Sequence, residues 1–305
     1  MNRPSMTLET SAYPSPGVVL EFLKPVTWFP PMWAYLCGVV SAGVALSGQW
    51  PMVLLGIVLA GPLICACSQA VNDWYDRHVD AINQPERPIP SGRLPGRWGW
   101  YLALLWTGLS AATAWLLGPA GFIAGLIGLA IAWAYSAPPL RLKANGWLGN
   151  GAVGLCYEGL PWVTAAIVMQ GGGLPAWPVF LMALLYSIGA HGIMTLNDFK
   201  SIKGDSQMGI ASVPVQLGVA GAAAAACWFM AVPQVVVVAF LLAVGQPGIA
   251  ALVAALLAGQ LVLMKWFRQD PVERATRFSA AGVLLYVLGM LASAFALRAM
   301  ALGQG

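Results

Sequence analysis

Charge is scarce in this sequence. Only 9% of its 305 residues are Asp, Glu, Lys or Arg, whereas 59% are hydrophobic. Soluble domains carry about 25% charged residues, so this chain has too little charge to cover a surface that faces water. The runs without charge are long: 25–72, 98–140, 206–264 and 278–297, together with 144–197, where Glu158 is the only charged residue. The composition therefore excludes a water-soluble globular protein and predicts an integral membrane protein.

The charge-free runs have the length of nine membrane-spanning helices, because one span needs about 20 apolar residues. Gly, Pro and polar turn signals divide four of the runs near their middles, at 47–51, 118–119, 171–173 and 245–248. We predict an all-α membrane protein in which 1–24 is a cytoplasmic N-terminal segment and 25–305 is a single nine-helix transmembrane domain. The expected helices are 26–47, 51–76, 98–117, 120–137, 148–170, 177–200, 214–243, 248–267 and 275–298.

Basic residues gather at one end of these predicted helices. They precede the first helix or fall in the connections after even-numbered helices, whereas the other connections contain no Lys or Arg; Arg298 is the exception. The positive-inside rule predicts that this end faces the cytoplasm. Topology thus accounts for the net charge of +4, and we expect no nucleic-acid partner.

Cysteines and the N-terminus carry no functional signal. The five cysteines all lie inside predicted helices, where the default is a small core residue. Cys65-Ala-Cys67 lacks the spacing of a zinc or redox motif. The first 20 residues have no apolar core segment, so we expect no signal peptide.

Two segments share one spacing of polar residues. Residues 72–80 read Asn-Asp-Trp-Tyr-Asp-Arg-His-Val-Asp, and residues 197–205 read Asn-Asp-Phe-Lys-Ser-Ile-Lys-Gly-Asp. The Asn, the first Asp and the last Asp coincide at an offset of 125 residues, and Ser201 replaces the middle Asp. Each segment stands at the end of an even-numbered predicted helix. We therefore predict an internal duplication, with two four-helix units of one orientation and a ninth helix.

Each segment is expected to present its acidic side chains on one helix face. At about 100° per residue, the Asn and three Asp residues of the first segment fall within an arc of about 100°, and the second behaves alike if it stays helical through Gly204. Clustered carboxylates near a membrane are costly unless a cation neutralises them, and oxygen ligands suit Mg²⁺. Solvated, capped helix ends are the alternative. The predicted Mg²⁺ ligands are Asn72, Asp73, Asp76, Asp80, Asn197, Asp198 and Asp205, of which Asp73, Asp76, Asp198 and Asp205 are expected to be catalytic.

Basic residues near both segments match a diphosphate. Arg binds phosphate oxygens through two parallel hydrogen bonds, and Lys supplies a mobile point charge. The alternative is that these residues only anchor the helices at the membrane surface. The expected diphosphate-binding residues are Lys24, Arg87, Arg93, Arg141, Lys143, Lys200 and Tyr135.

These motifs resemble the signatures of the UbiA superfamily of intramembrane prenyltransferases. Residues 72–80 followed by Arg-Pro-Ile-Pro-Ser-Gly at 87–92 resemble the first signature, 197–205 the second, and 135–143 the basic loop. Together with Leu-Lys-Pro-Val-Thr-Trp-Phe-Pro-Pro at 23–31, they are most similar to the chlorophyll and bacteriochlorophyll synthases. Tyr-Glu-Gly-Leu-Pro-Trp, residues 157 to 162, resembles the bacteriochlorophyll branch.

The resemblance implies a Mg²⁺-dependent prenyltransferase bundle with nine transmembrane helices. It implies esterification of the propionate of (bacterio)chlorophyllide with geranylgeranyl or phytyl diphosphate, which releases diphosphate. It places the chain in an inner membrane, cytoplasmic or intracytoplasmic and photosynthetic, with the site loops on the cytoplasmic side, and leaves room for association with other pigment-biosynthesis or assembly proteins. Family members often carry Asp where Ser201 stands, so the second cluster is expected to be the weaker one.

Other functions remain open at this point. A UbiA-type enzyme with an aromatic or haem acceptor, a transporter and a pigment-binding scaffold share parts of the pattern. Transporter carboxylates are expected near the membrane midplane, whereas these stand at one end. Ionisable residues inside a membrane are functional candidates, and aromatic faces stabilise developing positive charge, although interfacial anchoring is an alternative for the aromatics. The acceptor-pocket candidates are Glu158, His191, Trp74 and Tyr157.

Overall fold

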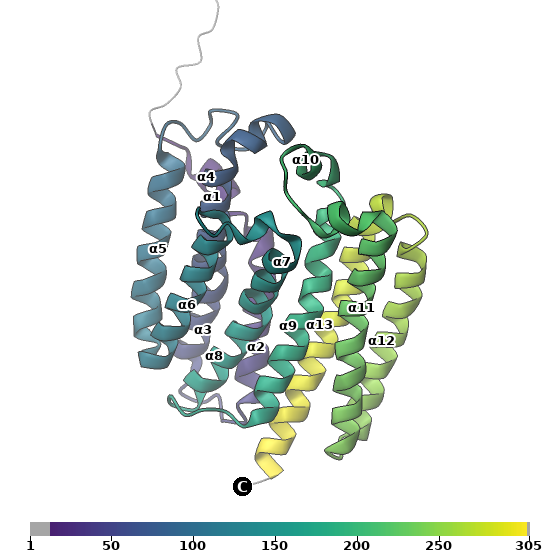
Figure 1. The fold of residues 1–305 in the computed structure, drawn as a ribbon. Coiled ribbons are helices and arrows are strands. Elements are labelled where there is room, and N and C mark those ends of the chain that lie inside the picture. Colours follow the sequence, from purple (N-terminus) through teal and green to yellow (C-terminus); the bar gives the residue numbers. More distant parts are fainter. Residues whose placement is uncertain (1–12, 304–305) are drawn as a thin grey trace, which may run out of the picture.

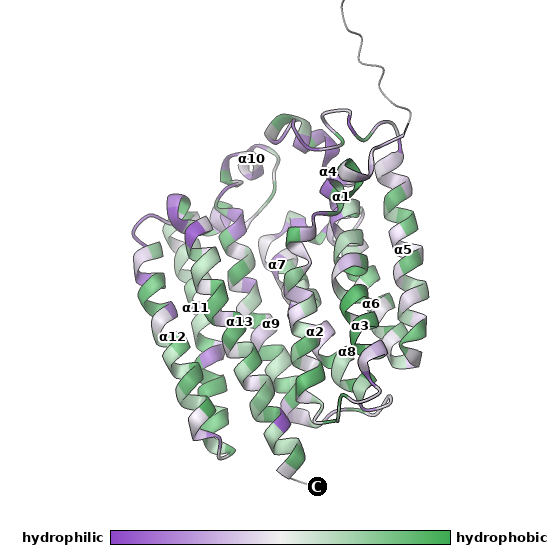
Figure 2. Cartoon of the chain, turned by 180° about the vertical axis from the view of Figure 1, so that it is seen from behind, coloured by the Kyte–Doolittle hydropathy of each residue, from purple (hydrophilic) through white to green (hydrophobic). Residues whose placement is uncertain are grey.

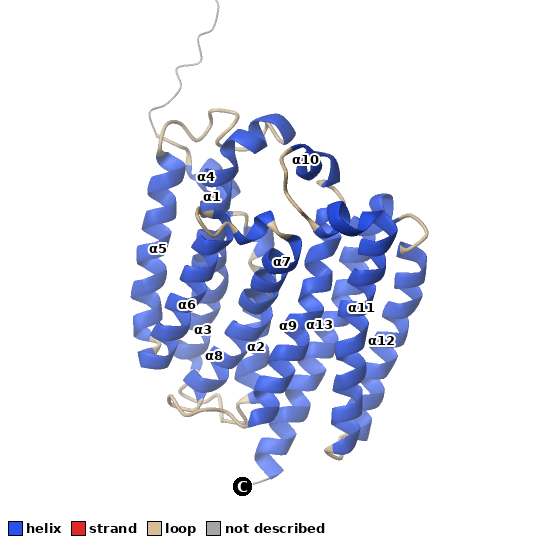
Figure 3. Cartoon of the chain, in the orientation of Figure 1, coloured by secondary structure: helices blue, strands red, loops and turns tan. Residues whose placement is uncertain are grey.

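Helices make up almost all of the computed structural model, which describes residues 13–303 (Figures 1 and 3). We expected a cytoplasmic N-terminal segment and no signal peptide. Both expectations concern mainly residues 1–12, which lie outside the described residues. The elements are α1 (Pro16–Leu23), η1 (Pro25–Thr27), α2 (Phe29–Ser41), α3 (Trp50–Val58), η2 (Leu59–Cys65), α4 (Ala66–Asn83), α5 (Trp98–Leu116), α6 (Gly118–Ser136), η3 (Leu142–Ala144), α7 (Gly146–Gly154), η4 (Leu155–Gly159), α8 (Leu160–Met169), α9 (Trp177–Asp198), α10 (Ile202–Gln207), α11 (Val213–Ala243), α12 (Pro247–Phe267) and α13 (Pro271–Gly303).

The chain is an integral membrane protein, and seven of its described helices are long and apolar enough to cross a membrane. The predicted number of nine is not confirmed. Of the two remaining predicted spans, α2 has only 13 residues, because the chain turns out of the helix before Gly43, which has a φ of 71°. Helix α5 has 19 residues, but its four Trp and one Tyr lower its hydropathy.

Two of the spans are continuous rods that contain one wide π-helical turn each. The first runs through α3, η2 and α4, with Pro62 inside η2, and the second runs through α7, η4 and α8. Proline lacks a backbone N–H and clashes with the preceding turn, and a π-turn accommodates this locally. The indole of Trp106 donates to the carbonyl of Pro62 at 2.9 Å, which satisfies one group of the widened turn as an apolar environment requires.

The long helices lie side by side, and the hydrophilic connections concentrate at the end that carries α10 and the end of α4 (Figures 1 and 2). Helices α1 and α4–α6 lie on one side of the bundle, and α9 and α11–α13 lie on the other (Figure 1). We call this hydrophilic end the polar end. At the polar end, the end of α4 on the first side faces α10 on the second side (Figure 1).

Buried polar side chains hold the second side together. The hydroxyl of Tyr286 donates to the carbonyl of Tyr186 at 2.5 Å, and the two hydroxyls of Tyr186 and Ser293 lie 2.8 Å apart. Gln234 on α11 donates to Gln260 on α12 at 2.5 Å. Such bonds between helices are useful in a membrane, because helix association gains little there from hydrophobic burial.

Candidate functional site

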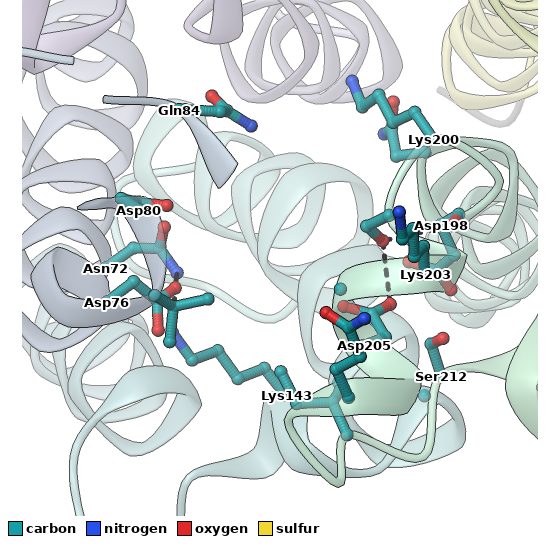
Figure 4. Close-up of a pocket in the computed structure, with 18 of the residues that line it drawn as sticks. Asn72, Asp76, Asp80, Gln84, Lys143, Asp198, Lys200, Lys203, Asp205 and Ser212 are labelled. Carbon is teal, nitrogen blue, oxygen red and sulfur yellow. Dashed lines mark hydrogen bonds and ion pairs between the residues drawn. The ribbon is translucent and has the colours of Figure 1, made fainter. Parts of the chain in front are cut away.

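A cavity of about 600 Å³ opens at the polar end, between the end of α4 and the segment from α9 through α10. Figure 4 shows the polar side chains of the two segments on opposite sides of its open centre. The chain thus brings together two segments that lie 125 residues apart in sequence. The sequence-predicted residues that line it are Asn72, Asp76, Asp80, Arg87, Tyr135, Lys143, Asn197, Asp198, Lys200 and Asp205.

Helix α4 presents the first acidic cluster. It continues to Asn83 rather than ending near residue 76 as expected, so Asn72, Asp76 and Asp80 repeat every four residues along one face. The amide of Asn72 donates to Asp76 at 3.2 Å and to the Ser136 hydroxyl at 3.3 Å. This pair of bonds fixes the cluster against α6.

Asp73 lies behind this face and is only 3% exposed. Lys24 Nζ lies 2.6 Å from Asp73 Oδ1, and Arg87 Nη1 lies 3.3 Å from the same oxygen. Arg87 also pairs with Asp80 at 2.7 Å. Two carboxylates and two cations from three separate segments therefore form one connected network beside the cavity.

Lys143 reaches from the loop after α6 to Asp76, with which it forms an ion pair. Its side chain is only 8% exposed, and this burial lowers the pKa of Lys143 while the Asp76 carboxylate opposes that shift. Arg141 lies further away, with Nη2 3.7 Å from Asp76 Oδ1. Of these two cations, Lys143 is thus the one closer to Asp76.

A backbone connection ties the Lys143 loop to the other wall of the cavity. The Gly146 N–H donates to the carbonyl of Ala211 at 2.8 Å, and the Ala211 N–H donates to the carbonyl of Ala144 at 3.0 Å. A Cβ on Gly146 would lie 2.5 Å from the backbone nitrogen of Val213, so only glycine permits this approach.

The second cluster is not a single helix face, because the helix is interrupted before Gly204 and the condition for that expectation is not met. Helix α9 ends at Asp198 and α10 begins at Ile202, so Asp198 and Asp205 belong to different helices. The Ser201 hydroxyl contacts the carbonyl of Asp198 at 3.1 Å and the carboxylate of Asp205 at 2.8 Å. A serine side chain that bonds to nearby backbone competes with the helical hydrogen-bond pattern. Ser201 therefore helps to form the turn and also orients Asp205.

Asn150 is a site residue that the sequence analysis missed. It lies on α7 with 4% exposure, and its amide donates to Asp198 Oδ2 at 3.1 Å and to Thr195 Oγ1 at 3.2 Å. An isolated amide within a charge-free run was the available signal, since polar groups inside a membrane are costly. Asn150 holds one carboxylate of the second cluster in place.

Arg93 and Trp74 are among the predicted residues that do not line the cavity. Arg93 forms a paired interaction with Glu21 at 2.5 Å and 2.7 Å near the protein surface, and this hydrogen bonding lowers the pKa of Glu21. Trp74 packs against Trp100, with ring centroids 6.0 Å apart. Its ring also lies 4.3 Å from the guanidinium carbon of Arg77.

Small apolar pockets lie next to the cavity, between η2, α6, α7 and η4. Tyr135 lines both the polar cavity and an adjoining apolar pocket of about 30 Å³. Tyr157 lines the same small pocket, and its hydroxyl accepts from Gln69 at 3.3 Å. A second apolar pocket of about 40 Å³ shares Ile64 and Cys156 with the first. The polar cavity and the two apolar pockets are thus linked by shared lining residues.

Glu158 and His191 are buried elsewhere. Glu158 is 3% exposed, and its Oε2 has no hydrogen-bond partner in the part of the chain that the structure describes. His191 stacks between Trp147 and Phe229, at centroid distances of 5.6 Å and 4.3 Å. Neither residue lines the polar cavity, so a direct role for them in an acceptor pocket stays a prediction.

The geometry around the acidic clusters is not that of a metal cage made by protein alone. Within residues 13–303, no three Asp, Glu, His or Cys side chains are grouped closely enough to hold a metal ion. Among the described residues, Asp73 Oδ2 and Asp76 Oδ1 are buried and accept no hydrogen bond, although Arg141 Nη2 lies 3.7 Å from Asp76 Oδ1. Buried polar atoms are nearly always satisfied, so each of these carboxylates has an oxygen left for a further partner.

The chain is similar to several known proteins along most of its length. The chain is 53% identical over 296 residues to the bacteriochlorophyll synthase 33 kDa chain of Cereibacter sphaeroides, which covers 97% of this chain and 98% of that protein. It is 37% identical over 290 residues to the chloroplastic chlorophyll synthase of Arabidopsis thaliana, with 91% and 73% coverage. A UbiA homologue from Archaeoglobus fulgidus, solved with DMAPP and Mg²⁺, has the same fold, with a TM-score of 0.69, 22% identity, and coverage of 90% of this chain and 98% of that one.

The sequence model of one family spans most of the chain. It matches residues 28–288, a range that contains both acidic segments, the Lys143 loop and Asn150. The resemblance inferred from the motifs is thereby confirmed, and the chain belongs to the UbiA prenyltransferase family.

Proposed function

We propose that this chain is a bacteriochlorophyll synthase, which esterifies the propionate of a (bacterio)chlorophyllide with geranylgeranyl or phytyl diphosphate and releases diphosphate. The observation that carries the proposal is a polar cavity that holds carboxylates and cations together and shares Tyr135 with an apolar pocket. This arrangement suits a substrate with a charged head and a long hydrocarbon chain. The 53% identity to a bacteriochlorophyll synthase chain over nearly the full length supports the pigment acceptor.

The diphosphate would bind in the polar cavity. Lys143, Lys200 and Lys203 line it, and Arg87 reaches it from the loop after α4. Their positive charges would stabilise the negative charge that grows on the departing oxygen, and fixed charges in a site that excludes water act strongly on such a change. The prenyl chain would extend past Tyr135 and Tyr157 toward the apolar pockets.

The residues present fit Mg²⁺. The donor set consists of carboxylate and amide oxygens, which this ion prefers, and Mg²⁺ is commonly held by one or two carboxylates together with substrate phosphates and water. A complete protein cage is therefore not required, and the carboxylates that line the cavity are suitable donors. When bound, the ion would neutralise phosphate charge as a Lewis acid. The residues proposed to hold it are Asn72, Asp73, Asp76, Asp80, Asn197, Asp198 and Asp205.

The reaction breaks the bond between the first prenyl carbon and the diphosphate oxygen. The acceptor carboxylate supplies the electron pair for the new carbon–oxygen bond, and the electrons of the broken bond leave with diphosphate. A propionate resembles the Glu side chain, whose pKa is about 4.3, so it is ionised at neutral pH and requires no general base. Tyr135 and Tyr157 would face the positive charge that develops on the allylic carbon, which aromatic rings stabilise.

The polar end is proposed to face the cytoplasm, in a cytoplasmic or intracytoplasmic photosynthetic membrane. The concentration of Lys and Arg at that end supports this orientation. The same placement disfavours a transporter, since the carboxylates lie at one end rather than at the midplane. Association with other pigment-biosynthesis proteins stays a prediction.

Turnover by the purified protein tests this function. The protein is incubated with bacteriochlorophyllide, geranylgeranyl diphosphate and Mg²⁺, and the esterified pigment is separated by chromatography. We expect ester formation that stops when Mg²⁺ is chelated. Turnover of an aromatic acid or a haem, with no ester of any chlorophyllide, would instead support a different acceptor within the same family.

A further inference from the structure

A second cavity lies between α11 and α12, and none of its lining residues lines the polar cavity. It has a volume of about 500 Å³. Trp228 on α11 and Leu261 on α12, which line it, are 67% and 48% exposed. Since both helices are apolar and long enough to span a membrane, this groove belongs to the surface that contacts lipid.

Small side chains on α11 create the groove. Ala224, Cys227 and Ala231 line it, and their spacing of three and four residues places them on one helix face. On α12 the lining runs from Leu261 to Arg268, a length of about 10 Å at 1.5 Å per residue. The result is an apolar slot long enough for part of an acyl chain.

Two cations stand at one end of this slot. Lys265 and Arg268 occupy the last turn of α12 and its C-cap, beside the α12–α13 connection at the polar end (Figure 1). Within residues 13–303 neither forms an ion pair or a side-chain hydrogen bond. The nearest acidic residues in sequence are Asp270 and Glu273, and Asp270 accepts a hydrogen bond from the Glu273 N–H at 3.2 Å.

Arg274, in the same α12–α13 region, differs from Lys265 and Arg268 because its side chain is hydrogen-bonded within the protein. Its guanidinium donates to the carbonyl of Trp266 at 2.8 Å and to the Gln269 side chain at 2.6 Å. A favourable interaction with the helix dipole explains why a cation is tolerated at the end of α12. It does not explain why two cations lie over an apolar groove.

We propose that this groove binds one anionic phospholipid, with its phosphate against Lys265 and Arg268 and an acyl chain along Ala224, Cys227 and Leu261. Basic pockets between membrane helices recognise anionic headgroups in this way. The two cations and the apolar slot together match the charged head and the acyl chain of a phospholipid.

Native mass spectrometry of the purified full-length chain tests the proposal, with phosphatidylglycerol or phosphatidylcholine as the added lipid. The wild type is expected to retain one phosphatidylglycerol more strongly than phosphatidylcholine. The variant Lys265→Gln/Arg268→Gln should bind it more weakly by about fivefold for each charge removed. Ala224→Leu keeps both charges but fills the slot, and it should also lose the bound lipid.

Arg277→Gln is the matched control. Arg277 is an exposed cation near the start of α13, and it does not line the groove, so its removal should leave lipid retention unchanged. The proposal would be overturned if Arg277→Gln lost the lipid equally, or if phosphatidylcholine bound as strongly as phosphatidylglycerol. It would also be overturned if inorganic phosphate displaced the lipid and Ala224→Leu had no effect. Ester formation in the same preparations is a separate readout, so failure here would leave the proposed function standing.

Discussion

Replacement of Asn150 by Ala should raise the Mg²⁺ concentration that turnover requires without unfolding the protein. Asn150 donates to Asp198 Oδ2 at 3.1 Å from a position that is 4% exposed. A hydrogen bond to a charged group contributes about 1.5–3 kcal/mol. If the loss is transmitted fully to metal binding, the Mg²⁺ concentration for half-maximal turnover rises roughly 10- to 150-fold, which overlaps the 10- to 100-fold effects typical of residues that orient metal ligands.

The assay is ester formation at a series of Mg²⁺ concentrations, with thermal unfolding measured on the same samples. Asn145→Ala is the matched control, because Asn145 caps the same helix by accepting from the N–H groups of Trp147 and Leu148. Its loss should cost about 1 kcal/mol of stability but leave the Mg²⁺ dependence unchanged. An unchanged Mg²⁺ dependence in Asn150→Ala, or an equal shift in both variants, would refute the positioning role.

Three further outcomes are expected. Asp76→Asn should reduce ester formation by at least about 100-fold while the protein stays folded, whereas Arg93→Gln, which alters a surface pair outside the cavity, should retain nearly full turnover. Burial lowers the pKa of Lys143, so turnover should be lost on raising the pH before an ordinary Lys would deprotonate, near 10.4; Lys143→Arg, which stays charged, should move this loss to higher pH in a pH–rate profile. Gly128→Leu would fill both apolar pockets and should raise the KM for geranylgeranyl diphosphate more than that for dimethylallyl diphosphate, and equal effects on both donors would contradict a chain path there.

Much of the fold follows from local sequence. Charge-free runs and turn residues predicted helical segments that correspond to the observed ones, because both signals are local. The count of nine membrane spans is not confirmed, since α2 has only 13 residues and α5 is rich in Trp. The absence of charge alone could not predict that α2 is short or that α5 has a lower hydropathy.

The site was predictable where the helix pattern persisted. The first segment stays helical, so the face with Asp76 and Asp80 followed from periodicity. The second breaks at residues 199–201, where the Ser201 hydroxyl bonds with Asp198 and Asp205, and this depends on a side-chain rotamer. Arg93 was predicted to bind the diphosphate. Its actual partner, Glu21, lies 72 residues away in sequence, so a local pattern could not reveal the pair.

The π-turn η2 gives the first rod a tolerance for insertions and deletions that ordinary helix lacks. A π-turn contains one residue more than the α-helical turn it replaces, so deletion of one residue within η2 can convert it to α-helix and leave α4 in its orientation. The same deletion between Asn72 and Asp76 would rotate the later carboxylates by about 100° and turn them away from the cavity. Length variation among relatives should therefore be accommodated before Ala66, in the membrane-embedded half of the rod, and be absent from the half that carries the acidic face.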